Sequence, residues 1–302
     1  MKIALTDSGF GGLGIAAELY EYLKTGHPAF PVEIIYVNGL PHERYGYNSI
    51  PEIEDKVNTF GSLLKNIENR LNPDLIVIAC NTLSVLFGKT DIYKQFTGKT
   101  VDILKFGTAT VLQRYKNETD ILLAIAGSKT TINSQIHSDF YQNFPLVFKT
   151  ILPIACTELI TAIERDSKSG NTRHLVTKCV RSVADEIGSN DYSAAVLVLA
   201  CTHFPYVEYL FRNALSRLSI KTFIQNPNID LLEYLKTLIP TAKCHKKQEI
   251  TIQVISKTAI EYFRMQSIAS LIESISENAV RALHNYQYNP GFYTVDVNIF
   301  KK

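Results

Sequence analysis

Two cysteines stand at the ends of closely similar apolar runs, one in each half of the chain. The run 73–82 reads PDLIVIACNT and the run 194–203 reads AAVLVLACTH, with Cys80 and Cys201 after the same alanine. A short run rich in Val, Ile and Leu and bounded by turn signals is typical of a strand buried on both faces. In an open parallel sheet, ligands bind beyond the carboxyl ends of the strands. The pattern therefore predicts that each thiol faces a ligand, with one thiol on each face of a bound substrate.

Small polar residues follow each cysteine and offer groups that hold ligands. The pair Asn81–Thr82 follows the first cysteine, and the pair Thr202–His203 follows the second. Their hydroxyl, amide and imidazole groups, with the backbone N–H groups beyond the strand end, suit a carboxylate ligand. Asn and Thr are also good helix caps, and a cap role does not exclude a ligand role. A lone histidine is usually structural, but the position directly after a strand-end Cys-Thr favours a functional role for His203.

A glycine-rich segment, 7–14 (DSGFGGLG), follows the first apolar run and precedes a helical pattern. Its glycines match Gly-x-Gly-x-x-Gly, which binds dinucleotides when an acidic residue ends the second strand. That place is held by Asn38, so the match does not favour a dinucleotide. We expect the turn instead to bring N–H groups to a small anion at a helix N-terminus. Asp7 and Ser8 would face that ligand or cap the helix.

The bulk composition excludes several classes of function. The 302 residues are 46% hydrophobic and 20% charged, with a formal net charge of +2. These values are typical of a globular protein and give no electrostatic reason to expect nucleic acid or an anionic membrane as a partner. The apolar start is too short for a signal peptide, and no run is long enough to span a bilayer. We therefore expect a cytoplasmic protein without membrane partners.

The remaining cysteines indicate neither disulfides nor metal. The chain holds five cysteines, an odd number, and no Cys-x-x-Cys pair; the other three are Cys156, Cys179 and Cys244. This excludes a disulfide framework and a zinc knuckle, so we expect free thiols and no metal. Most free cysteines are buried and pack as small apolar residues, which is the expectation for Cys179 and Cys244.

Strand and helix patterns alternate along the chain, which favours an α/β fold with mainly parallel sheets. The first half predicts strands at 2–6, 32–37 and 75–79 and helices at 13–24 and 51–70. A second series follows, with predicted strands at 104–107, 121–126, 147–152 and 195–200, and helices ending near 115 and spanning 177–187. The last elements are predicted helices at 204–218 and 231–238 and strands at 222–225 and 250–255.

These elements predict two similar, pseudo-symmetric α/β domains with the active site in the cleft between them. A break rich in Lys, Thr and Gly at 97–100 is the expected boundary. The first domain then comprises 1–97 plus 207–266, and the second comprises 98–206. A C-terminal extension, 267–302, holds a predicted amphipathic helix at 268–286 that packs on the body or on a partner subunit.

Five segments together resemble the signature motifs of the glutamate racemase family, within the cofactor-independent aspartate/glutamate racemases. They come in the order and spacing of that family and extend from the first strand to about residue 206, with a looser likeness to about 266. The segments are 7–12 (DSGFGG), 45–46 (YG), 79–82 (ACNT), 127–134 (GSKTTINS) and 201–205 (CTHFP).

The resemblance implies a racemase that needs no cofactor and whose partner is an amino-acid substrate. Cys80 and Cys201 would be the acid/base catalysts, assisted by Asp7 and His203. A thiolate removes the α-proton on one face and a thiol returns one on the other, and the two exchange roles in the reverse reaction. The implied product is D-glutamate for peptidoglycan, and a homodimer is expected. The implied substrate-binding residues are Ser8, Tyr45, Gly46, Asn81, Thr82, Ser128, Thr131 and Thr202.

The sequence also departs from the family pattern. Where the family has Gly-Asp-Thr-x-x-x-Pro-Tyr-Gly, segment 38–46 reads NGLPHERYG, so the Asp and Thr are missing and Arg44 replaces the proline. Arg44 would either clamp a carboxylate or lie on the loop surface. Ser128 replaces a Thr and keeps its hydroxyl, and segment 267–302 has no clear counterpart. These departures leave aspartate or another acidic amino acid, or a non-catalytic amino-acid-binding protein, as alternatives.

Overall fold

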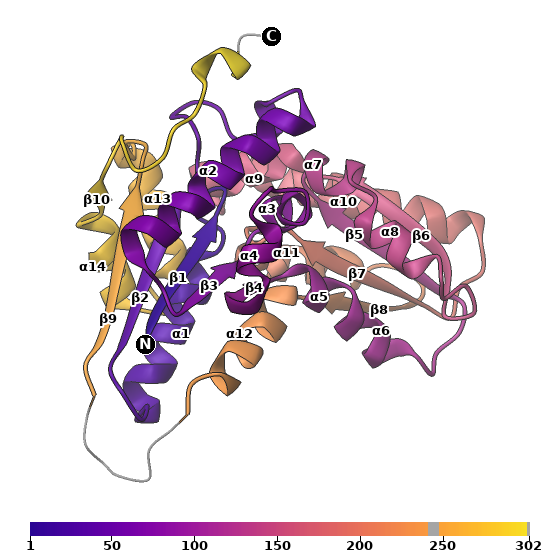
Figure 1. Cartoon of the computed structure of the whole chain (residues 1–302). Helices are drawn as coiled ribbons and strands as arrows, with labels where there is room; N and C mark the ends of the chain where they lie inside the picture. Colours follow the sequence, from indigo (N-terminus) through magenta and orange to yellow (C-terminus); the bar gives the residue numbers. More distant parts are fainter. Residues whose placement is uncertain (241–247, 301–302) are drawn as a thin grey trace. The chain divides into compact units, whose positions relative to one another are not determined.

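The computed structural model describes residues 1–240 and 248–300, so Cys244 lies outside the described residues. The chain divides into two compact units. The first comprises Met1–Asp102 and Leu231–Lys302, and the second comprises Ile103–Asp230. Each unit is an α/β sandwich built around its own sheet, coloured along the sequence in Figure 1.

The first unit contains a six-stranded sheet in the order β10-β9-β2-β1-β3-β4. Every pair of neighbouring strands is parallel. The central strands are nearly continuous apolar runs, because helices cover both faces of a parallel sheet. The strands are β1 (Lys2–Asp7), β2 (Val32–Asn38), β3 (Leu75–Ile78), β4 (Thr100–Asp102), β9 (Ile250–Ser256) and β10 (Gln287–Tyr288).

Helices pack on both faces of this sheet. α1 packs with α13 and α14, while α2 covers the opposite face, as right-handed crossovers from β1 to β2 and from β2 to β3 require (Figure 1). The helices are α1 (Leu13–Gly26), α2 (Ile53–Leu71), α3 (Asn81–Phe87), α4 (Tyr93–Phe96), α12 (Pro227–Thr237), α13 (Tyr262–Ile272) and α14 (Glu277–His284), with short 3-10 turns η1 (Tyr47–Ser49), η2 (Thr97–Lys99) and η4 (Val297–Phe300).

The sequence of α2 explains where it begins, ends and packs. Glu54 and Asp55 in its first turn carry negative charge at the positive end of the helix dipole, which stabilises the start of the helix. Asn72 ends the helix in a left-handed conformation with φ 44°, and its N–H bonds to the Glu68 carbonyl. Its buried residues include Phe60, Leu63, Leu64 and Ile67, whose helical spacing forms one apolar stripe against the sheet.

The second unit contains a four-stranded parallel sheet in the order β6-β5-β7-β8. Its strands are β5 (Ile121–Gly127), β6 (Phe148–Ala155), β7 (Ala194–Ala200) and β8 (Lys221–Gln225). Its helices are α5 (Leu104–Gly107), α6 (Ala109–Tyr115), α7 (Lys129–Asn133), α8 (Ile136–Tyr141), α9 (Thr157–Asp166), α10 (Gly170–Ser189) and α11 (Glu208–Leu215), with η3 (Phe204–Val207).

Four strands of the first unit repeat the topology of the second. Counted within each unit, the order is second-first-third-fourth in both: β2-β1-β3-β4 and β6-β5-β7-β8. Cys80 and Cys201 each follow the third strand of their unit, and Ser8 and Ser128 each follow the first. The predicted α/β class with two mainly parallel sheets is confirmed, and the repeat gives the two thiols equivalent places.

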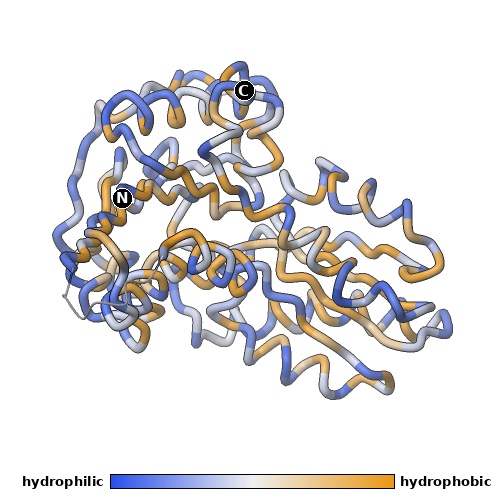
Figure 2. Tube along the Cα trace, turned by 60° about the horizontal axis from the view of Figure 1, so that its bottom comes forward, coloured by the Kyte–Doolittle hydropathy of each residue, from blue (hydrophilic) through white to orange (hydrophobic). Residues whose placement is uncertain are grey.

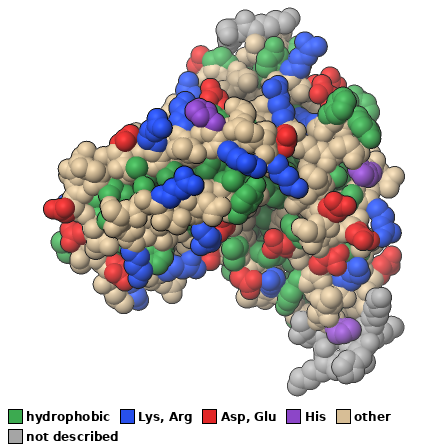
Figure 3. All heavy atoms as spheres, turned by 180° about the vertical axis from the view of Figure 1, so that it is seen from behind, with side chains coloured by type: hydrophobic (Ala, Val, Ile, Leu, Met, Phe, Trp, Pro, Cys, Tyr) green, Lys and Arg blue, Asp and Glu red, His purple; other side chains and the backbone are tan. Residues whose placement is uncertain are grey.

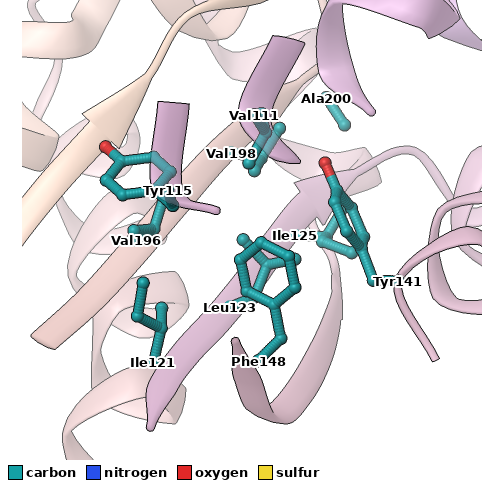
Figure 4. Packing of buried hydrophobic residues seen from close by; sticks show 10 residues of the cluster. All are labelled: Val111, Tyr115, Ile121, Leu123, Ile125, Tyr141, Phe148, Val196, Val198 and Ala200. Atoms are coloured by element: carbon teal, nitrogen blue, oxygen red, sulfur yellow. The ribbon is translucent and has the colours of Figure 1, made fainter. Parts of the chain in front are cut away.

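A buried cluster fixes the second sheet against α6 and α8. Leu123, Ile125, Val196 and Val198 from the two central strands pack with aromatic rings from the helices (Figure 4). Tyr141 is fully buried in this cluster, and its hydroxyl donates to the Gly107 carbonyl at 2.5 Å. The cluster therefore holds the strands that end at Ser128 and Cys201 without leaving this phenol unpaired.

Two predicted elements, and the domain to which one segment was assigned, differ from the structure. Residues 104–107 form helix α5, and the strand lies earlier, at β4, where it pairs with β3 and keeps 97–102 in the first unit. The predicted helix 268–286 is two helices, because Ser276 interrupts it and caps α14 by accepting the Ala279 N–H. Residues 207–230, expected in the first domain, belong to the second unit, because β8 pairs with β7.

The C-terminal extension joins the first unit, because β10 adds to β9 and α14 packs on β9. Among the described residues, no helix has the length and apolar character to cross a membrane. The hydropathy-coloured trace alternates between apolar and polar stretches along the chain (Figure 2). Basic and acidic side chains are interspersed on the face in Figure 3, in keeping with the small net charge.

Candidate active site

Cys80 lies at the carboxyl edge of the first sheet, beside the end of β1. β1 and β3 run in register, with Thr6 opposite Ile78, so Asp7 and Cys80 emerge at the same edge. The Cys80 side chain is buried, and its Sγ lies 3.1 Å from the Ser8 Oγ. The Ser8 hydroxyl in turn lies 3.4 Å from Asp7 Oδ1. A carboxylate, a hydroxyl and a thiol thus form a short polar chain.

The glycine-rich turn holds the Asp7 carboxylate. The N–H groups of Gly9 and Gly12 donate to its two oxygens at 3.2 and 2.8 Å. A Cβ on Gly12 would lie 2.9 Å from the Ala79 Cβ, so no larger residue fits there without displacing β3 or Asp7. The N–H groups of this turn thus bind the chain's own Asp7 carboxylate, where the sequence led us to expect a small anion. The same carboxylate lies next to the Ser8 hydroxyl.

Burial and charge keep the Cys80 sulfur protonated in the ligand-free chain. Burial raises the pKa of the Cys80 thiol well above its usual value, and the negative charge of Asp7 raises it further. Hydrogen bonds from Ser8 and from the Leu83 N–H lower it only in part. Cys80 is therefore a thiol at neutral pH, which is the form that donates a proton.

Two buried polar side chains around Cys80 have no hydrogen-bond partner among residues 1–240 and 248–300. Neither the nitrogen nor the oxygen of the Asn81 carboxamide makes a hydrogen bond, although Asn81 is 1% exposed. The Tyr47 hydroxyl is equally buried and unpartnered. Burial, followed by the charges of Tyr293 and Cys80, raises the Tyr47 pKa, so this phenol lies within electrostatic reach of the thiol. Buried orphan groups are rare in proteins and indicate a place for a ligand.

The residues of segment 38–46 take different places. Gly46 precedes η1, and Tyr45 is 42% exposed with its ring stacked on His42 at 5.1 Å between centroids. Arg44 is exposed, which agrees with the loop-surface alternative. Thr82 is buried in the first turn of α3.

Cys201 lies at the carboxyl edge of the second sheet. β5 and β7 run in register, with Gly127 opposite Ala200, so Ser128 and Cys201 emerge side by side. The Cys201 Sγ lies 3.8 Å from His203 Nδ1, and His203 Nε2 lies 2.8 Å from Glu164 Oε1. The three side chains are buried and form a thiol–imidazole–carboxylate series.

The imidazole of this series carries a proton at neutral pH. Burial lowers the pKa of His203, but the hydrogen bonds to Cys201 and Glu164 and the charges of these two groups outweigh it and raise the pKa to about 10. Below that pH the ring is an imidazolium whose charge the Glu164 carboxylate balances. A positive ring beside the sulfur stabilises negative charge on it.

The other predicted residues of the second unit surround this edge. Ser128 caps α7 by accepting the Thr131 N–H at 3.2 Å, and the two hydroxyls lie 3.1 Å apart. Thr202 is buried, and its carbonyl accepts a hydrogen bond from the Asn228 amide at 3.2 Å.

Sequence reasoning missed Glu164 and Tyr47. Glu164 lies within an ordinary amphipathic helix, α9, and no local pattern distinguishes it from the acidic residues on either side of the helix. Tyr47 follows the predicted pair Tyr45–Gly46 directly, which is the one signal that would have drawn attention to it. Among residues 1–240 and 248–300, no cluster of His, Cys, Asp and Glu has the composition of a metal site.

Comparison with known proteins agrees with these motifs. No family model matches the chain. "Glutamate racemase 3" of Caldanaerobacter subterraneus is 26% identical over 208 residues, which are 68% of this chain and 67% of that protein. The glutamate racemase of Mycobacterium avium is 28% identical over 216 residues, 70% of each chain.

The fold comparison covers more of the chain. The glutamate racemase RacE1 of Bacillus anthracis matches with a TM-score of 0.65 and 18% identity, covering 95% of both chains. The glutamate racemase of Francisella tularensis, solved with D-glutamate, matches with a TM-score of 0.64 and 20% identity, covering 90% of this chain and 93% of that one. The chain is similar in sequence to glutamate racemases over more than two thirds of its length, and similar in fold over nearly all of it, as its motifs predict.

Proposed function

We propose that the chain is a racemase that interconverts L- and D-glutamate with Cys80 and Cys201 as its acid/base pair, without a cofactor. The observation that carries the proposal is the equivalent place of the two thiols, each buried at the carboxyl edge after the third strand of its unit. The sequence relationship to curated glutamate racemases supports the choice of reaction.

The proposed chemistry needs a base on one side of the α-carbon and an acid on the other. One thiolate takes the α-proton, and the electron pair left behind is delocalised into the adjacent carboxylate. The opposite thiol gives its proton to the other face of the planar carbon, which inverts the centre. The first sulfur is then a thiol and the second a thiolate, so the same pair performs the reverse reaction.

The surroundings of the two thiols support different starting forms. Cys80 is held as a thiol by burial and by the Asp7 charge, so it is the proton donor in the ligand-free enzyme. Beside Cys201, the positive ring of His203 would stabilise the negative charge of this sulfur in the step in which it acts as the base. When the direction reverses, the Ser8 hydroxyl stabilises negative charge on Cys80, and the substrate ammonium offsets the Asp7 charge.

We propose that residues at the strand edges of both units bind the substrate. In the first unit, the orphan carboxamide of Asn81 and the groups of Ser8, Tyr45, Gly46 and Thr82 would bind its polar ends. In the second unit, Ser128, Thr131 and Thr202 would supply the hydroxyl and N–H donors beyond β5 and β7. Aspartate is the second candidate substrate, because segment 38–46 lacks the Asp and Thr of the family motif.

The cellular role follows as part of the same proposal. D-Glutamate made in the cytoplasm would supply peptidoglycan synthesis, and the enzyme would act on a free amino acid, without nucleic acid or membrane partners. A homodimer is the proposed assembly, which light scattering of the purified chain would test.

The test follows the α-proton directly. Purified protein is incubated with L-glutamate or L-aspartate in deuterated water, and deuterium at the α-carbon and the yield of the D-enantiomer are measured. Cys80→Ser and Cys201→Ser should each lower racemisation by about 10² to 10⁴-fold, because each removes a proton-transfer group. Cys156→Ser, which removes a thiol at the end of β6, is the control and should keep full activity.

Retention of racemisation in both catalytic variants would refute the two-thiol mechanism. Binding of glutamate by calorimetry without any exchange in the wild type would instead support the non-catalytic alternative. Faster exchange with aspartate than with glutamate would correct the substrate and leave the mechanism intact.

A further inference from the structure

Two of the places where the sequence departs from the family pattern lie against each other in the structure. Segment 38–46 carries Tyr45 and Gly46 of the proposed substrate site, and segment 287–300 is the last part of the C-terminal extension. Both belong to the first unit. Their contact involves a buried hydrogen bond and a group of three aromatic rings.

Segment 287–300 is fixed to the sheet and to α2 by contacts that precede its contacts with segment 38–46. The Asn289 N–H donates to the Ser256 carbonyl at 2.8 Å, directly after β10 pairs with β9. Arg70 of α2 donates to the Gly291 carbonyl at 2.8 Å, and its guanidinium lies 5.7 Å from the centre of the Phe292 ring. Phe292 is 2% exposed. These contacts make the segment a rigid support rather than a loose tail.

Tyr293 fixes the start of segment 38–46, which we call the substrate-binding loop. Its hydroxyl donates to the Gly39 carbonyl at 2.8 Å, while the Gly39 N–H donates to the Asp7 carbonyl at 2.7 Å. A Cβ at Gly39 would lie 2.7 Å from Leu63 and 2.8 Å from the Asp7 carbonyl oxygen, so the backbone fits there only without a side chain. Gly39 stands where the family motif has an acidic residue, and its backbone is bonded to Tyr293 on one side and to Asp7 on the other.

Phe300 supports the other end of the loop. Its ring stacks on Tyr45 with 5.5 Å between centroids and an interplanar angle of 22°, and it lies 5.3 Å from the His42 ring. His42 and Tyr45 stack on each other as well. The three rings hold Tyr45 in one orientation, although it is exposed to solvent.

We infer that Tyr293 and Phe300 are positioning residues of the substrate-binding loop, which hold Tyr45, Gly46 and Tyr47 in the arrangement that binds an amino dicarboxylic acid. The inference rests on the proposed function for the identity of the ligand. It assigns to the C-terminal extension the support of a loop that lacks the Asp and Thr of the family motif. A preorganised loop binds ligand without the entropic cost of ordering it.

The experiment compares Tyr293→Phe and Phe300→Ala with Phe300→Tyr and Val297→Ala. Phe300→Tyr keeps an aromatic ring in the stack and should therefore keep the loop in place. Val297 is 55% exposed in the same 3-10 turn, so Val297→Ala is the matched control. Steady-state racemisation gives KM and kcat, and hydrogen exchange by mass spectrometry gives the protection of residues 38–47. Thermal unfolding measures overall stability.

Tyr293→Phe and Phe300→Ala should raise KM for glutamate about three- to tenfold, as expected for one lost hydrogen bond or ring stack, with kcat within twofold. Faster exchange should be confined to residues 38–47, and Phe300→Tyr and Val297→Ala should behave as the wild type. Unchanged KM and unchanged loop protection in both variants would overturn the inference. A general loss of stability without a selective rise in KM would also overturn it.

Failure of the proposed function can be distinguished from failure of the positioning role. If the wild type racemises no acidic amino acid, the proposed function fails, and loop protection in the same four variants still decides the positioning role. In that case, faster exchange confined to residues 38–47 supports the inference, and its absence contradicts it.

Discussion

At the scale of single residues, the two thiols differ mainly in what lies next to them. Cys80 has a hydroxyl at 3.1 Å and a carboxylate behind it, whereas Cys201 has an imidazole at 3.8 Å backed by a carboxylate. The first arrangement favours a neutral thiol, and the second places a positive ring beside the sulfur. A symmetric reaction can therefore begin from an asymmetric pair.

The His203–Glu164 contact predicts a specific pH dependence. Glu164→Gln removes the carboxylate charge, so the pKa of His203 should fall below its value of about 10. Racemisation that needs the imidazolium should then decline at a lower pH in the variant than in the wild type. NMR titration of the His203 ring and the pH–rate profile check this, and identical profiles for both proteins would contradict it.

The same contact affects stability with a defined sign. Because the folded-state pKa of His203 is raised above the value of about 6.5 in an unfolded chain, its stabilisation is complete below about pH 6.5. It is lost as the pH rises through about 10. Glu164→Gln should reduce this dependence in the free energy of unfolding measured between these pH values, because it removes one of the two groups that raise the His203 pKa.

At the scale of elements, the site depends on parallel strands that end at the same edge. The register of β1 with β3 brings Asp7 next to Cys80, and the register of β5 with β7 brings Ser128 next to Cys201. The glycine turn between β1 and α1 then fixes the carboxylate behind the first thiol.

Gly12→Ala tests how tightly that turn is packed. The added methyl group would lie 2.9 Å from the Ala79 Cβ and 3.0 Å from Asp7 Oδ2, so β3 or the carboxylate must shift. We expect a loss of about 1–3 kcal/mol in the free energy of unfolding by denaturant, together with reduced activity. Gly88→Ala is the control, because its Cβ would meet nothing within 4 Å. Equal stabilities of the two variants would contradict the close packing.

At the scale of the whole molecule, the chain contains one topology twice, and local sequence patterns were sufficient to find every strand of the two copies except β4. Strand ends at Cys80 and Cys201 were predictable because apolar runs and turn residues are local signals. The side chains that act through long-range contacts were not. Glu164 reaches His203 across 39 residues, and Tyr293 reaches Gly39 across 254, so only the folded chain brings them together.

The domain boundaries show the same limit. A break in composition at 97–100 marked the region, but strand pairing of β4 places the division after Asp102. Likewise, the pairing of β8 with β7, which no composition signal reveals, keeps residues up to Asp230 in the second unit.

The central claim is that one α-carbon lies between the two thiols. A crystal structure of the chain with glutamate bound tests it most directly. The account predicts the Sγ atoms of Cys80 and Cys201 in contact with opposite faces of the same α-carbon, with the Asn81 carboxamide bonded to the ligand. Glutamate bound with both sulfurs on one face, or with either sulfur out of reach of the α-carbon, would contradict it.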